Sequence, residues 1–269
     1  MKKHYIYILL LIPCLALQAQ VGINTTSPEG VLDISGSNIG LIYPVVSLTD
    51  VNVETISNPN GASLVAGTTV FNTNTSTAGS SSVYPGIYIW TGTKWIPQFN
   101  KNDSMLASQT NPVLRTDGNA GVQTISLDNT SFTPNFSGDY RIAITVHFGG
   151  GRLNTVSNPQ YANFGAQKGE FNFIFNSVPH KFDVRSYSGV NNDDYSDGGT
   201  DRIYDNQFHQ VTYVVNKTLT RGTTYNFSLS FDMDSNTIFQ NSGNSGNGRG
   251  YINTNDDIEC TIEFNYMGE

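Results

Sequence analysis

The sequence predicts an all-β fold, and three observations lead to that prediction. Segments of the C-terminal half alternate apolar and polar residues with the period of two that a half-buried strand requires. Charged residues make up 13% of the chain, about half the ~25% of an ordinary soluble domain, and Asn, Ser, Thr and Gly take their place. No long segment has the composition and period of a helix. A β-sandwich or barrel with polar loops follows from this pattern.

The stretch TSFTPNFSGDYRIAITVHF, residues 130–148, organises the C-terminal region. A turn around Pro134 and Gly138 precedes a strand, and that strand places five apolar residues on one face: Tyr140, Ile142, Ile144, Val146 and Phe148. Similar alternation predicts further strands at 123–127, 170–175, 180–187, 207–216, 223–233 and 258–266. The sheets of the fold are therefore expected to assemble from these segments.

The first twenty residues have the features of a secretory signal peptide. Lys2 and Lys3 precede an apolar run over residues 5–17. Cleavage is expected after Ala19, with Gln20 as the alternative end of the signal peptide. The run is too short to span a bilayer as a permanent helix. We expect a protein that is secreted or held at the outer cell surface, with the periplasm as the alternative and no integral membrane segment after cleavage.

Residues 84–95 predict a β-hairpin that turns at Gly92. Its tryptophans, Trp90 and Trp95, have two interpretations. They close a small core, which we favour, or they form a platform on which a sugar stacks. The polar segment 100–121, interrupted by Pro112 and Gly118, predicts a linker.

Residues 21–99 contain a recurring pattern of Gly-Ile-Asn-Thr, Leu-Asp-Ile and Gly-Leu-Ile. It continues through 47–52 and 67–76 to the ending PGIYIWTGTKW, and its first part is carried by Gly22, Ile23, Asn24, Thr25, Pro28, Leu32, Asp33, Ile34, Gly40, Leu41, Ile42 and Pro44. Tyr43 and Val45 depart from it. The pattern resembles the start of many secreted proteins of Bacteroidetes-type bacteria and the repeats of phage tail fibres. That resemblance implies a small tail-fibre-like β module at the cell surface, without a known chemistry.

A second pattern opens the C-terminal region, carried by Phe132, Pro134, Gly138, Tyr140, Ile142, Ile144 and Val146. It is similar to the signature that opens the jelly roll of the complement first-component and tumour-necrosis-factor superfamily. Residues 219–231 look like a later hairpin of that fold, although Thr223 stands where Asp is common and the ending FNYMG differs. The resemblance implies a homotrimeric jelly roll that binds ligands or receptors and does no catalysis.

The predicted organisation has four parts. A signal peptide at 1–20 precedes the tail-fibre-like β module at 21–99, the linker at 100–121 and a jelly-roll β-sandwich at 122–269.

The sequence gives no support for catalysis or nucleic-acid binding. Cys260 lies among alternating apolar residues, which predicts a place in the core. The histidines His147, His180 and His209 lack the spacing of zinc ligands, and no G-x-S-x-G motif accompanies them. The net charge of −8 and the absence of a Lys/Arg cluster exclude phosphate-backbone binding.

Two candidate binding sites lie in the C-terminal region. The loop NNDDYSDGGTD, residues 191–201, crowds four carboxylates that are candidate calcium ligands: Asp193, Asp194, Asp197 and Asp201. Neutralisation by Arg185 and Arg202, or a solvated loop, is the alternative. Tyr187, Tyr195 and Tyr204 are candidate ligand-binding residues, because loops at the end of a rigid sandwich are where binding residues concentrate.

We therefore expect a non-catalytic binding or adhesion protein that is multivalent through trimerisation. A glycan or a protein at a surface is the expected ligand. A monomeric carbohydrate-binding β-sandwich and a structural subunit of a surface fibre or matrix are the alternatives.

Overall fold

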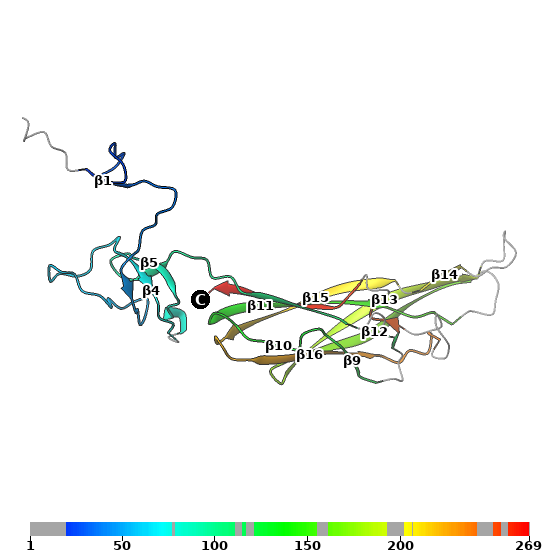
Figure 1. Cartoon of the computed structure of the whole chain (residues 1–269). Helices are drawn as coiled ribbons and strands as arrows, with labels where there is room; N and C mark the ends of the chain where they lie inside the picture. The colour runs from blue at the N-terminus through cyan, green and yellow to red at the C-terminus, as the bar shows by residue number, and fades with distance from the viewer. Residues whose placement is uncertain are drawn as a thin grey trace, which may run out of the picture. The chain divides into compact units, whose positions relative to one another are not determined.

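The computed structural model describes residues 20–76, 79–110, 115–116, 121–154, 161–192, 202–205, 207–240, 250–253 and 258–268 (Figure 1). In these ranges the regular elements are strands and the 3₁₀ turn η2, Gly79–Ser81, so the all-β prediction is confirmed. None of the described segments is a helix with the length and apolar character needed to cross a membrane. The chain divides into two compact units, residues 1–44 and 45–269.

The first unit has little structure of its own. Strands β1 (Val21–Ile23) and β2 (Leu32–Ile34) pair in parallel. Asn24 turns the chain after β1 with a φ of 58°, and its side-chain amide donates to the Ser35 carbonyl at 2.8 Å. None of the described residues 20–44 is buried. Residues 20–44 therefore form no hydrophobic core within one chain.

Residues 45–99 form a small sheet. Its strands lie in the order β3 (Val45–Val46), β4 (Thr69–Asn72), β5 (Gly86–Trp90) and β6 (Trp95–Pro97), which confirms the predicted hairpin. The two tryptophans are 2% and 1% exposed, with ring centroids 5.2 Å apart. The core interpretation of Trp90 and Trp95 is confirmed, and the sugar platform is wrong because these rings have no free face.

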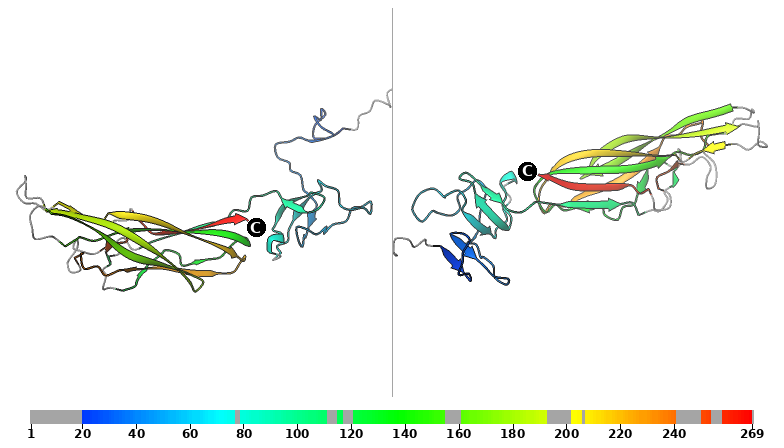
Figure 2. Two further views of the ribbon diagram at one scale, coloured as in Figure 1. Left: turned by 180° about the vertical axis from the view of Figure 1, so that it is seen from behind. Right: turned by 90° about the horizontal axis from the view of Figure 1, so that it is seen from above.

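The remaining strands form two facing sheets (Figure 2). They are β7 (Ser104–Ser108), β8 (Arg115–Thr116), β9 (Gln123–Ile125), β10 (Ser131–Phe132), β11 (Gly138–Gly149), β12 (Tyr161–Phe175), β13 (Val178–Asn192), β14 (Arg202–Tyr204), β15 (Phe208–Leu219), β16 (Tyr225–Met233), β17 (Gly250–Tyr251) and β18 (Thr261–Gly268). In one sheet β11 lies between β18 and β15, and β7 pairs with β18. In the other, β16 pairs with β9, β10 and β12, and β12 pairs with β13. Each of the two facing sheets has six strands, and together they form a β-sandwich of the jelly-roll type.

The core lies between the two sheets. All five apolar residues of the organising strand β11 are fully buried, as predicted. Aromatic rings fill much of the space: Phe132 stacks on Phe264 at 4.6 Å, and Phe171 lies 4.6 Å from Phe231. Cys260 is also fully buried, and burial raises the pKa of its thiol to about 12. The predicted core role of this cysteine is confirmed.

The predicted linker at 100–121 includes a strand of the sandwich. Strand β7 pairs with β18 from Ser108↔Thr261 to Ser104↔Asn265, and Ala107 enters the core with no exposed surface. The adjacent apolar residues Met105, Leu106 and Ala107 show no alternation, which is why the sequence pattern missed this edge strand.

Candidate ligand-binding site

A hollow of about 240 Å³ lies on the outer face of the sandwich, where β12, β13 and β14 pair. Seven residues line it: Phe164, Gly165, Tyr187, Ser188, Gly189, Tyr204 and Gln207. The lining is aromatic and small, with hydroxyl and amide groups and no charged side chain. At ~30 Å³ per water molecule, the hollow has room for about eight waters.

The register of the three strands creates this hollow. Phe164 pairs with Gly189, and Gly189 pairs with Tyr204, so two aromatic residues flank one glycine in a row across the sheet. Phe164 is 78% exposed and Tyr204 is 55% exposed. A Cβ on Gly189 would lie 2.9 Å from a ring carbon of Phe164, so glycine leaves the space that the ring occupies. Tyr187, two residues before Gly189, adds a third ring on this face.

Polar groups surround the aromatic rings. The ring of Tyr187 lies 5.2 Å from that of His209. The side-chain amide of Gln207 donates to the Asp205 carbonyl at 3.1 Å, and the Gln207 carbonyl accepts from the Ser186 hydroxyl at 2.5 Å. The hollow therefore has apolar ring faces at its walls and hydrogen-bonding groups beside them.

The sheet beneath the hollow is supported from the inside. A Cβ on Gly165 would lie 2.7 Å from Leu153 and 2.8 Å from Ile238, so these side chains pack directly against the glycine. Leu153, Val190 and Phe239 form a small buried cluster, with Ile203 packed against it. The hollow thus rests on a packed layer.

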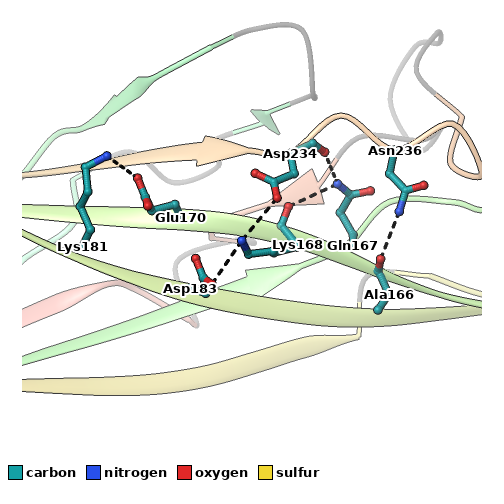
Figure 3. A network of polar contacts seen from close by, with 8 residues as sticks. All are labelled: Ala166, Gln167, Lys168, Glu170, Lys181, Asp183, Asp234 and Asn236. Carbon is teal, nitrogen blue, oxygen red and sulfur yellow. Dashed lines mark hydrogen bonds and ion pairs between the residues drawn. The ribbon is translucent and has the colours of Figure 1, made fainter.

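A polar network fastens the chain after β16 to β12 (Figure 3). The Lys168 ammonium lies 3.2 Å from the Asp183 carboxylate and 3.6 Å from that of Asp234. The buried Gln167 amide donates to the Asp234 carbonyl at 2.5 Å, and the Asn236 amide donates to the Ala166 carbonyl at 3.3 Å. Together these bonds hold the segment that carries Ile238 and Phe239 under the hollow.

Replacing Gln167 with leucine is expected to lower the free energy of unfolding by about 1.5 kcal/mol. Gln167 is 2% exposed, and leucine of similar size removes the donor from the buried Asp234 carbonyl. Urea unfolding followed by tyrosine fluorescence measures the change. A variant as stable as the parent would show that this bond does not hold the segment.

The structure brings together two of the three predicted binding tyrosines. Tyr187 and Tyr204 line the same hollow, and Tyr195 lies outside the described residues. Sequence reasoning missed Phe164 and Gly189, because the predicted strands began at 170 and ended at 187. Both strands in fact reach fifteen residues, and the glycines at 165, 169 and 189 interrupt the apolar alternation.

The predicted calcium ligands, Asp193, Asp194, Asp197 and Asp201, also lie outside the described residues. Within the part of the chain that the structure describes, no three His, Cys, Asp or Glu side chains gather in a metal-binding group. Calcium binding by the 191–201 loop stays a prediction.

Two of the histidines are linked to the stability of the sandwich. Burial lowers the pKa of His147 and of His180, and the charge of Lys217 lowers that of His180 further. An unfolded chain takes up these protons near pH 6.5, whereas the folded chain takes them up only at lower pH. The unfolded state therefore binds more protons below pH 6.5, and stability falls as the pH decreases through this window.

We expect the free energy of unfolding to be lower at pH 5.5 than at pH 7.5. Urea titrations at both values test this, and His147→Gln should show a smaller difference than the parent. An equal difference in parent and variant would contradict a contribution from His147.

The N-terminal region presents a different kind of surface. Its apolar side chains are between 49% and 87% exposed at seven positions: Val21, Ile23, Val31, Leu32, Ile39, Leu41 and Ile42. Exposed apolar side chains in a segment without a core of its own are available to pack against another chain.

A family model described as the phage tail like trimerisation region matches residues 22–112. The match covers the N-terminal region with the exposed apolar side chains, and it supports the tail-fibre-like segment predicted at 21–99 as well as a homotrimer. No curated protein matches the chain.

Solved structures similar to the chain include viral capsid proteins. The VP2 subviral particle of infectious bursal disease virus matches with a TM-score of 0.29 and 10% identity over 65% of this chain. The T13 particle of the same virus matches with a TM-score of 0.19 and 10% identity over 67% of this chain. The chain spans 35% and 42% of those two proteins. At these scores the likeness carries no conclusion about function.

Proposed function

We propose that this chain is an exported, trimeric surface-binding protein. The N-terminal region joins three chains, and each chain contributes one jelly roll that binds a target. The proposed function is non-catalytic, and adhesion to a surface glycan or protein is its purpose.

One observation carries the proposal. Among the described residues 20–44 none is buried, although the segment exposes seven apolar side chains. Burying apolar surface stabilises a fold by about 25 cal/mol per Å², and residues 20–44 of a single chain gain little of this stabilisation. Three copies that cover one another's apolar surfaces supply the missing core, and the family match at 22–112 favours this assembly. The resemblance of residues 132–146 to the complement first-component and tumour-necrosis-factor superfamily implies the same stoichiometry.

Trimerisation explains how weak individual sites give firm attachment. Once one jelly roll has bound a surface, the other two meet their targets at a high effective concentration. Adhesion to a repetitive surface therefore requires only modest affinity at each site. The signal-peptide features of residues 1–20 are consistent with export.

Two measurements on a producing bacterial culture test the proposal. Mass spectrometry of the purified protein should give an N-terminus after Ala19, and added proteinase should digest the protein on intact cells. A chain that keeps Met1 and resists proteinase until the cells are broken would overturn the proposed location.

A third measurement tests multivalency. Binding to target cells should weaken at least about tenfold when trimers are converted to monomers, and equal binding by both forms would overturn multivalency.

A further inference from the structure

We propose that the hollow formed by Phe164, Gly189 and Tyr204 binds one neutral pyranose ring of a glycan. This inference rests on the proposed binding role of the jelly roll and names the class of ligand. It does not depend on trimerisation.

The lining determines the charge of the ligand. The seven lining residues carry no ionic side chain, so a charged ligand would lose hydration without gaining an ion pair. A neutral molecule avoids this cost. Sugars without carboxylate, sulfate or phosphate groups meet this requirement.

The aromatic row determines the shape of the ligand. Phe164 and Tyr204 stand on either side of Gly189, and both rings are more than half exposed. The faces of aromatic rings carry partial negative charge. A pyranose presents a face of polarised C–H groups to such a ring, while its hydroxyl groups point outward at the edges.

The polar groups distinguish a sugar from an apolar side chain. Tyr187 and Tyr204 carry phenol hydroxyls, and Gln207 carries an amide. A ligand that covers the two phenol hydroxyls must form hydrogen bonds with them, because burying a polar group without a partner is unfavourable. Sugar hydroxyls both donate and accept hydrogen bonds, whereas a leucine or phenylalanine side chain can do neither.

The volume fits one ring. A pocket that encloses a drug-sized ligand has a volume of roughly 300–1,000 Å³, whereas this hollow has about 240 Å³. A sugar seated here keeps part of its surface in water. We therefore expect weak binding, with a Kd on the order of 1 mM for a monosaccharide, which corresponds to about −4 kcal/mol.

The test uses methyl glycosides of glucose, galactose, mannose and N-acetylglucosamine as probes, with the purified full chain. Saturation-transfer NMR and tyrosine fluorescence titration should detect at least one of them. Methyl glucuronide tests the expected preference for neutral sugars, and N-acetylphenylalanine amide represents an apolar peptide side chain.

Three variants locate the binding. Phe164→Ala and Tyr204→Ala each remove one exposed ring and should weaken binding about tenfold, which is a typical cost for a stacked aromatic ring. Gly189→Val puts a side chain where the Phe164 ring lies, since a Cβ at this position would already be 2.9 Å from that ring. The ring must then move, so this variant should abolish binding. Met267→Ala removes a side chain that is 65% exposed and lines a separate hollow, and it should bind like the parent.

Several results would overturn the inference. The first is that none of the four neutral glycosides binds. The second is that Gly189→Val binds a glycoside as well as the parent does. The third is that the phenylalanine amide binds while no glycoside does. A change in oligomeric mass on Phe164→Ala would show that a second copy covers the hollow, and it would also overturn the inference. Because monosaccharide affinity at one site does not require trimers, a monomeric protein that binds glycosides would refute only the proposed assembly.

Discussion

Replacing Leu41 and Ile42 with aspartate is expected to convert the protein from trimers to monomers, a threefold loss of mass. The two side chains are 58% and 87% exposed within one chain, and both lie in the region that matches the trimerisation model. In the proposed trimer they help to form the core that residues 20–44 lack in a single chain. Six added carboxylates at such an interface would be buried without partners, which costs several kcal/mol per charge.

A matched control separates this effect from a general effect of charge. Val122 is 69% exposed and lies outside residues 22–112, so Val122→Asp should leave the mass unchanged. Light scattering after size exclusion reports both masses. A double variant that keeps the mass of the parent would show that Leu41 and Ile42 are not part of the interface.

Replacing Asp103 with alanine is expected to lower the free energy of unfolding by about 3 kcal/mol. Asp103 is 7% exposed. Its carboxylate accepts hydrogen bonds from the Tyr140 hydroxyl at 2.7 Å and from the Asn135 backbone and side-chain amides at 2.8 and 2.9 Å. Bonds to a charged acceptor contribute about 1.5–3 kcal/mol each, and removing the acceptor leaves buried donors. Burial and the bond to Asp103 raise the pKa of Tyr140 well above its usual value, in agreement with a buried, neutral phenol that donates here.

Urea unfolding measures this loss, with Asp50→Ala as the control. The Asp50 carboxylate accepts one exposed bond, from the Asn52 amide, and its removal should cost less than about 1 kcal/mol. Equal effects of the two substitutions would show that Asp103 does not anchor β7 to the turn before β11.

The strands of the jelly roll were predictable because their alternation is uninterrupted. Every second residue of β16 from Tyr225 to Met233 is apolar, and the three at its centre, Phe227, Leu229 and Phe231, are buried. Strand β7 was not predictable in this way, since a short edge strand buries few side chains. Its place depends on pairing with β18, whose partner residues lie about 150 positions later in the chain. Long-range pairing of this kind leaves no local pattern.

The aromatic hollow could not be predicted from the local sequence pattern either. Tyr187 and Tyr204 were identified as exposed aromatic residues near a loop, but the row Phe164–Gly189–Tyr204 depends on the register of three strands. A one-residue shift in that register would move Gly189 to the opposite face. The sequence indicates which residues are aromatic, and only the pairing shows which of them meet.

The mass of the purified full chain in solution tests the central claim most directly. Light scattering on a size-exclusion column should give three times the mass of one chain, with no change across a tenfold dilution. A mass equal to that of one chain would contradict the trimer and leave the jelly roll as a single binding module.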